Sequence, residues 1–181
     1  MRQAAENLEP VIYAACLAAY NRGLLHGAWI AVEDDADAVR AAIAAMLAAS
    51  PVVGAEEWAI HDHEGFGGVE IGEYAAIDRV VEVAALLRRR GRLGALVLDH
   101  LDGDLDAAST ALDEQYHGLF DSLAEVFQSL TEDSLTIPPA LQAYIDWDAM
   151  ARDAELNGEV FTLAAAEGQG APGAVHVFWN R

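Results

Sequence analysis

The first part of the chain alternates short apolar runs with turn-forming residues, a pattern typical of β-strands. Apolar residues that favour strands fill Val11–Ala18 and recur over Leu24–Val32. The segment Glu57–His63 alternates large apolar residues with polar neighbours, as a half-buried strand does. The pattern therefore predicts a β-rich N-terminal region with three strands.

Apolar positions at helical spacing interrupt these strands and then follow them. Within the β-rich region they predict one helix over Asp37–Ala49, which Asp34 or Asp35 can cap. After Tyr74 the same spacing predicts an amphipathic helix that ends at Gly91, followed by the short apolar run Leu93–Leu101. Further helices are predicted over Leu105–Gln115, Ser122–Leu130, Pro139–Tyr144 and Asp146–Leu156, with Ser122 and Glu125 suited to form a capping box.

The C-terminal end returns to strand patterns over Glu159–Leu163 and Ala174–Trp179, joined by a stretch rich in Gly and Ala. Strands, then helices, then helices with strands indicate an α+β fold. We expect three small domains in a row. They are a β-rich domain over residues 1–72, a helical domain over 73–115, and a mixed α/β domain over 116–181.

Charge separates this chain from most proteins of its length. Its 181 residues include 30 Asp and Glu against 10 basic residues, all of them Arg, which gives a formal net charge of −20. Because Lys and Arg supply the affinity for phosphate, we expect no direct binding of nucleic acid. A basic partner is the better expectation. Halophilic adaptation or a GC-rich genome would also produce an acidic chain without lysine.

Targeting signals and cysteine usage indicate the compartment. No apolar run approaches the ~20 residues that span a bilayer, and the N-terminal residues have no signal-peptide core. The single cysteine, Cys16, excludes a disulfide framework and any cysteine-based zinc cluster. We therefore expect a cytoplasmic protein that does not bind membranes.

Candidate catalytic and metal-binding motifs are weak. The acidic turn that begins at Asp102 lacks the glycine and the glutamate that complete a calcium loop. His61 and His63 could share one strand face but need a third metal ligand from elsewhere. Cys16 lies in an apolar run, and no phosphate-binding or nucleophile motif occurs. We expect no enzyme activity, no metal and no cofactor, and we expect the arginines at 88–90 and 92 to bridge to nearby acids.

The acidic residues are spread over the predicted elements rather than gathered in a tail. A folded surface with a continuous negative field can present DNA-like charge to a DNA-binding enzyme. B-DNA has one charge per ~1.7 Å of axis, so a dimer of formal charge −40 matches ~70 Å of duplex. The candidate DNA-mimic residues are Glu33, Asp34, Asp35, Asp37, Glu56, Glu57, Asp102, Asp104, Asp106, Asp113, Glu114, Asp121, Glu125, Glu132 and Asp133.

Several blocks of residues, spread from about Val11 to Asn180, resemble segments that one protein family has in the same order. The blocks lie within Ile12–Ile30, Glu56–Phe66, Gly72–Tyr74, Tyr116–Leu123, Ala151–Leu156 and Val175–Trp179, and include the continuous stretches Cys16-Leu17-Ala18-Ala19-Tyr20-Asn21 and Glu56-Glu57-Trp58-Ala59-Ile60-His61-Asp62. Together they resemble the ArdA antirestriction proteins.

The resemblance implies a cytoplasmic, non-enzymatic DNA mimic carried by mobile genetic elements. Such a protein occupies the DNA-binding groove of type I restriction–modification enzymes, on their methyltransferase core, so that incoming DNA escapes cleavage. The resemblance also implies an elongated chain of three small domains that forms a homodimer through its C-terminal part. We expect Val175, Val177, Phe178 and Trp179 in that interface, because a small domain could hardly bury all four so close to the chain end.

Two other classes of function remain compatible with the residues. The chain could be a generic acidic protein that inhibits another basic DNA-binding protein. It could also be a metal-dependent enzyme that uses the acidic loop near Asp102. Binding to a purified type I methyltransferase tests the first alternative, and titration with calcium or magnesium tests the second.

Overall fold

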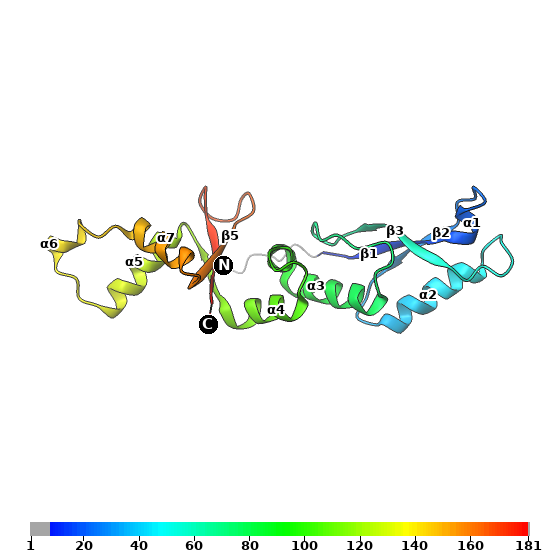
Figure 1. Ribbon diagram of the computed structural model, residues 1–181, viewed down its shortest axis with the longest axis horizontal. Helices are drawn as coiled ribbons and strands as arrows, with labels where there is room; N and C mark the ends of the chain where they lie inside the picture. The colour runs from blue at the N-terminus through cyan, green and yellow to red at the C-terminus, as the bar shows by residue number, and fades with distance from the viewer. Residues whose placement is uncertain (1–7, 181) are drawn as a thin grey trace. The chain divides into compact units, whose positions relative to one another are not determined.

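The computed structural model describes residues 8–180 and divides the chain into two compact units, residues 1–108 and 109–181. Each unit contains one three-stranded antiparallel sheet together with helices (Figure 1). The order of elements is β-rich, then helical, then mixed, which confirms the predicted α+β class. The division into three domains stays a prediction, and the two units are described separately.

The first unit is built on a sheet whose central strand is β1 (Val11–Cys16). Strands β2 (Gly27–Ala31) and β3 (Trp58–Glu64) pair with it on either side, and all three lie within a few residues of their predicted positions. A one-turn helix, α1 (Leu17–Tyr20), follows β1. Because the strands alternate their side chains, β1 presents Ile12 and Ala14 to one face of the sheet and Tyr13 to the other.

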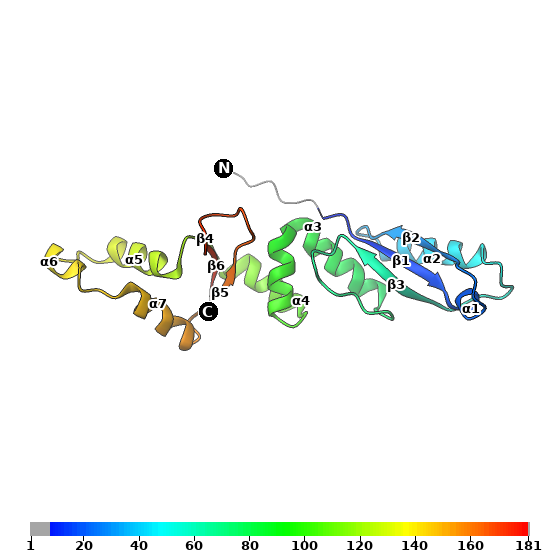
Figure 2. The same cartoon turned by 90° about the horizontal axis from the view of Figure 1, so that it is seen from above.

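Two helices, α2 (Ala36–Ala48) and α3 (Ile77–His100), lie on the same side of this sheet (Figures 1 and 2). The core of the unit lies between the sheet and these helices. Ile12 and Ile30 of the sheet, with Val39 of α2 and Val80 of α3, are at most 7% exposed. The hydrophobic burial that stabilises the unit is therefore concentrated on one face of the sheet.

Gly91 divides α3 into two arms. Its φ of 57° and ψ of −144° lie outside the helical region, in a conformation that side-chain-bearing residues rarely adopt. The prediction that the first helix ends at this glycine is therefore confirmed. The run Leu93–Leu101, for which the sequence pattern assigns no element, supplies the second arm, and Val97 and Leu98 within it are buried.

The second unit has β6 (Val175–Trp179) at the centre of its sheet, between β4 (Tyr116–Phe120) and β5 (Val160–Ala164). Strands β5 and β6 confirm the two predicted C-terminal strands. The sequence pattern missed β4. It follows α4 (Leu105–Thr110) and one turn of π-helix, η1 (Ala111–Gln115), which together occupy the helix predicted over residues 105–115.

Helices α5 (Leu123–Ser134) and α7 (Trp147–Leu156) pack side by side in the second unit, with α6 (Pro139–Gln142) between them in sequence. Ser122 caps α5 as predicted, but Glu125 binds the residue before the cap instead of closing the capping box. The Ser122 hydroxyl accepts a hydrogen bond from the Glu125 N–H at 3.1 Å, and the Glu125 carboxylate accepts one from the Asp121 N–H at 3.2 Å. The core beneath these helices is formed by Leu123, Val126, Ala151, Ala154, Val160 and Val177.

Candidate functional site

The predicted DNA-mimic surface consists of side chains that solvent can reach. All fifteen candidate carboxylates are exposed: Glu33, Asp34, Asp35, Asp37, Glu56, Glu57, Asp102, Asp104, Asp106, Asp113, Glu114, Asp121, Glu125, Glu132 and Asp133. Residues 1–108 contain 18 Asp and Glu against 8 Arg, and residues 109–181 contain 12 against 2. Each unit therefore has a formal net charge of −10, so the negative charge is shared equally between them.

Two of the candidate carboxylates begin helices. The Asp35 carboxylate caps α2 and accepts hydrogen bonds from the N–H groups two and three residues later, at 2.9 and 3.2 Å. The Asp104 carboxylate makes the same pair of bonds at the start of α4, at 3.0 and 2.9 Å. A capping carboxylate stabilises a helix by ~0.5–2 kcal/mol, so these two residues have a structural role as well as a charge.

Arginines of the first unit neutralise two more candidates. Arg88 donates hydrogen bonds to the Asp34 carboxylate and to the Val32 carbonyl. Arg40 contacts the Asp37 carboxylate at 2.7 Å and also pairs with Asp78. The expectation that the arginine cluster bridges to nearby acids is confirmed for Arg88.

In the second unit, some candidates bind their own neighbourhood. Asp121 accepts the Ala171 N–H at 3.4 Å, which ties the start of α5 to the loop before β6. Glu132 accepts a hydrogen bond from the Gln128 side chain at 3.0 Å, one helical turn away. These exposed contacts contribute little stability each, because solvent screens them.

Of the candidates left, Asp113 has an interaction of its own. The others are the free carboxylates, a name used here for Glu33, Glu56, Glu57, Asp102, Asp106, Glu114 and Asp133. Within residues 8–180, their side chains make no hydrogen bond or ion pair with another residue. A carboxylate without an internal partner keeps its full charge available to a partner molecule. The free carboxylates occur in both units.

The negative field is strong enough to act on a neighbouring phenol. The pKa of Tyr74 is raised, first by the charge of Glu73 beside it, with a smaller contribution from the charge of Glu57. Tyr74 is 73% exposed, so the carboxylates act on a side chain at the surface.

The motifs weighed for metal or catalytic chemistry have structural roles here. Asp102 adopts a φ of 51° in the turn before α4, and Asp104 caps that helix. The His63 Nε2 accepts the Ile71 N–H at 3.2 Å and lies 3.6 Å from Glu70. Cys16 is fully buried. In the described part of the chain, no three His, Cys, Asp or Glu side chains are grouped so that they could hold a metal ion.

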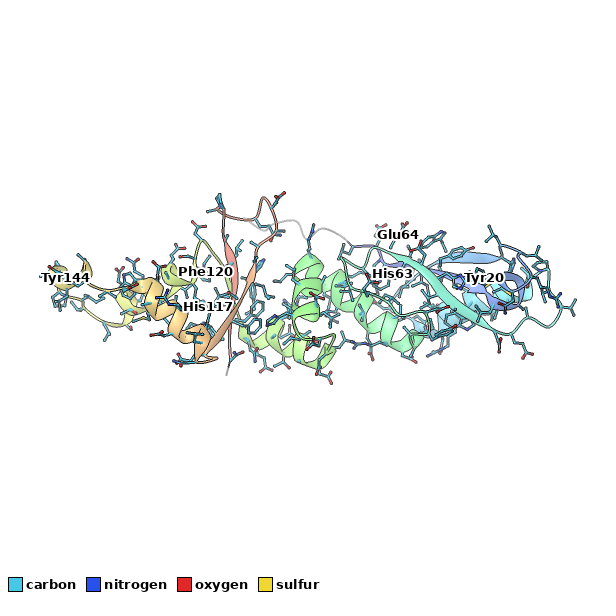
Figure 3. The ribbon with its side chains drawn as sticks, turned by 45° about the horizontal axis from the view of Figure 1, so that its top comes forward. Tyr20, His63, Glu64, His117, Phe120 and Tyr144 are labelled. Atoms are coloured by element: carbon cyan, nitrogen blue, oxygen red, sulfur yellow. The ribbon has the colours of Figure 1, made fainter. Side chains whose placement is uncertain are left out.

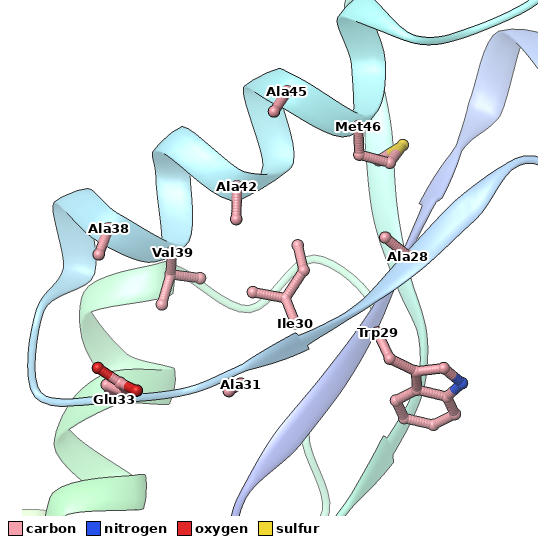
Figure 4. A pocket seen from close by; sticks show the side chains of 10 residues that line it. All are labelled: Ala28, Trp29, Ile30, Ala31, Glu33, Ala38, Val39, Ala42, Ala45 and Met46. Carbon is pink, nitrogen blue, oxygen red and sulfur yellow. The ribbon is translucent and has the colours of Figure 1, made fainter.

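An apolar hollow of about 450 Å³ lies between α2 and β2 (Figure 4). It exists because α2 presents small side chains, Ala38, Ala42 and Ala45, beside Ile30 of the strand. Glu33 is the one charged residue in its lining, so the hollow lacks the convergent polar groups of a substrate pocket.

The proposed dimer-interface residues are placed differently from the expectation. Val177 and Phe178 are fully buried within a single chain, where the Phe178 ring stacks on Phe161 at a centroid distance of 4.6 Å. The premise that a small domain could not bury the chain end is therefore wrong for these two residues. Val175 and Trp179 are half-buried against the core of the same unit.

Comparison of the sequence with models of known protein families identifies the family of this chain. A family model described as antirestriction protein (ArdA) matches residues 12–166, most of the chain. The chain belongs to the ArdA antirestriction protein family. The resemblance seen in the sequence blocks is thereby confirmed, and the chain shares the antirestriction function of this family of inhibitors.

No curated protein matches the chain. Within the described residues, none of the helices is both long enough and apolar enough to cross a bilayer.

Sequence reasoning missed one part of the surface, the aromatic residues of the first sheet. Tyr13 and Trp29 lie directly opposite each other on β1 and β2, with ring centroids 5.4 Å apart. The alternating pattern of the strands, read with their pairing, is the signal that could have located them.

Proposed function

We propose that this ArdA protein is a DNA mimic that occupies the DNA-binding groove of type I restriction–modification enzymes, on their methyltransferase core. One observation carries the proposal: all fifteen candidate carboxylates are exposed, and they are distributed over both units. By binding the groove in the cytoplasm, the protein prevents the enzyme from binding and cleaving incoming mobile DNA.

The charge of the protein is of the size that such mimicry requires. Ten net negative charges per unit correspond to ~17 Å of B-DNA axis, at one charge per ~1.7 Å. A groove that binds DNA is lined with Lys and Arg, which pair with any closely spaced row of anions. The free carboxylates, which no described residue neutralises, are the best suited to take the place of phosphates.

The protein acts by occupancy rather than by chemistry under this proposal. Binding through many weak contacts needs no catalytic residue, metal or cofactor, and we propose none. The chain itself does not bind nucleic acid, because its net charge repels phosphate.

We propose a homodimer formed through the second unit. The segment from α5 to α7 exposes large apolar side chains that a solvated surface would not retain without a partner. Tyr144 is 85% exposed beside α6 (Figure 3), and Leu141 is 55% exposed. The other exposed apolar residues of this segment are Leu130, Leu135, Met150 and Leu156.

A cleavage assay tests the proposed function. Unmodified DNA that carries the recognition sequence of a type I enzyme is incubated with the enzyme and increasing amounts of the protein. Protection of the DNA at amounts near those of the enzyme is expected. If a basic DNA-binding protein unrelated to restriction is inhibited equally well, a generic acidic inhibitor would be the better description.

A further inference from the structure

One face of the sheet in the first unit carries aromatic side chains and acids instead of a covering helix. Helices α2 and α3 both lie on the opposite side (Figures 1 and 2). Figure 4 shows Ile30 directed towards α2 and Trp29, its neighbour on β2, directed away from it. Trp29 is 49% exposed, although a tryptophan in a single unit of this size is usually well buried.

The pairing of the strands defines which residues share this face. Tyr13 lies opposite Trp29 on one side and opposite Asp62 on the other, and Val11 lies opposite Glu64. Residues directly opposite in an antiparallel pair project to the same face. The face therefore presents two aromatic rings beside two carboxylates, and we call Tyr13, Trp29, Asp62 and Glu64 the aromatic–acid face.

The Tyr13 ring packs closely against the backbone of β2 at Gly27. A Cβ atom added to Gly27 would lie 2.7 Å from the Tyr13 ring and 2.6 Å from the Ala14 carbonyl oxygen. Only glycine allows the Tyr13 ring to lie over β2 in this way. The Tyr13 and Trp29 rings are tilted by 56°, and about half of Trp29 stays open to solvent.

Within residues 8–180, neither carboxylate of this face forms an ion pair with a cation. The strands β1, β2 and β3 contain no arginine. Asp62 accepts one hydrogen bond, from the N–H of the next residue at 2.8 Å, and Glu64 pairs with no other described residue. Both side chains are exposed, and Glu64 lies at the end of β3 (Figure 3).

Charge decides what kind of molecule fits this face. A second copy of the chain would place Asp62 and Glu64 against another copy's acids, so like charges oppose self-association there. A guanidinium group complements both features, because it stacks on an aromatic face and pairs with carboxylates in a planar, bidentate manner. An ammonium group pairs with the carboxylates but gains less from the rings.

We infer that the aromatic–acid face binds arginine side chains of the partner enzyme and anchors the complex at the first unit. The inference rests on the proposed function for the identity of the partner and adds a contact that a phosphate mimic does not need. Trp29 supplies the stacking surface, and Asp62 and Glu64 supply the charge. Trp and Arg are the residues that most often dominate binding at protein interfaces.

Two binding measurements test this inference. The first compares the affinity of the wild-type protein, Trp29→Ala and Tyr74→Ala for a purified type I methyltransferase. Tyr74 is a matched control, since it is an exposed aromatic residue of the same unit that lies outside the face. Trp29→Ala is expected to weaken binding about tenfold or more, with Tyr74→Ala within about twofold of wild type. Equal effects of the two variants would overturn the inference.

The second measurement needs no restriction enzyme and so separates this inference from the proposed function. Oligoarginine and oligolysine peptides of equal length are titrated against the folded protein. Wild type is expected to bind oligoarginine about fivefold more tightly than oligolysine, and both Trp29→Ala and the isosteric Asp62→Asn are expected to reduce that preference. Circular dichroism checks the fold of each variant.

Each result of the peptide measurement decides the matter. Equal binding of the two peptides by wild type, or an undiminished preference in both variants, would overturn the aromatic–acid face as an arginine site. If wild type prefers oligoarginine and the variants reduce that preference, but wild type does not bind the methyltransferase, the face stands as an arginine site and the proposed partner is wrong.

Discussion

Removing charge at the free carboxylates should weaken binding far more than removing the same charge elsewhere. The test variant carries Glu33→Gln, Glu56→Gln, Glu57→Gln and Asp106→Asn, all in the first unit, and changes the formal charge from −20 to −16. These side chains are exposed and make no hydrogen bond or ion pair with another described residue. The variant should therefore fold as wild type does.

The expected magnitude follows from the value of an exposed ion pair. Such a pair contributes ~0–1 kcal/mol, and we take ~0.4 kcal/mol for each contact with the groove. One substitution then weakens binding about twofold, and four together cost ~1.6 kcal/mol, about 14-fold in Kd at ~1.4 kcal/mol per factor of ten. The dependence of binding on salt should also become shallower, since fewer ions are exchanged on binding.

A matched control separates local contacts from net charge. Asp34→Asn, Asp35→Asn, Asp37→Asn and Asp104→Asn together remove four charges from the same unit, but from carboxylates that cap helices or pair with arginine. Asparagine also caps helices well, so the fold should persist. This control should weaken binding less than the free-carboxylate variant.

Isothermal titration calorimetry against a purified type I methyltransferase, at two salt concentrations, provides the affinities. Equal losses in the two quadruple variants would show that only net charge matters. Loss of all binding from one single substitution in a folded protein would refute the reasoning, because a discrete site would then replace the distributed surface.

Four further predictions concern stability and assembly. Gly91→Ala should destabilise the first unit by ~1–3 kcal/mol, because a side chain strains the backbone at a φ of 57°; urea denaturation measures this, and an unchanged midpoint would contradict it. The melting temperature should rise from low salt to ~0.3 M salt, since screening relieves repulsion within a net charge of −20. Burial lowers the pKa of His176 below its usual 6.5, so the unfolded chain gains a proton first as pH falls; stability should decline from about pH 6.5 down to the folded-state pKa, and His176→Asn should lessen that decline in thermal melts. Tyr144→Asp with Leu141→Asp should convert the dimer to a monomer in sedimentation, and a persisting dimer would place the interface elsewhere.

Local sequence pattern was sufficient for most elements of the fold. Strand β1 and helix α2 lie where apolar spacing and capping residues place them, because their signals are contained within a few neighbouring residues. Strand β4 was missed because its pairing partner β6 lies about sixty residues away, so nothing nearby marks it as a strand. Burial of Phe178 was misjudged for the same reason, since Phe161 and β4 complete its surroundings.

The candidate site was predictable in its exposure but not in its internal pairing. Charged side chains are rarely buried, so the exposure of all fifteen carboxylates followed from their type. Asp34 forms its ion pair with Arg88, which lies 54 residues later in the chain, and no local pattern reveals such a contact. Likewise, the grouping of Trp29 with Asp62 depends on the register of three strands.

Competition with DNA tests the central claim most directly. A fluorescent duplex that carries the recognition sequence is bound to a type I methyltransferase, and the protein is added while fluorescence anisotropy is followed. The account predicts that the duplex is fully displaced and that the complex of protein and enzyme contains no DNA. A ternary complex with the duplex still bound, or anisotropy that does not change at saturating protein, would contradict it.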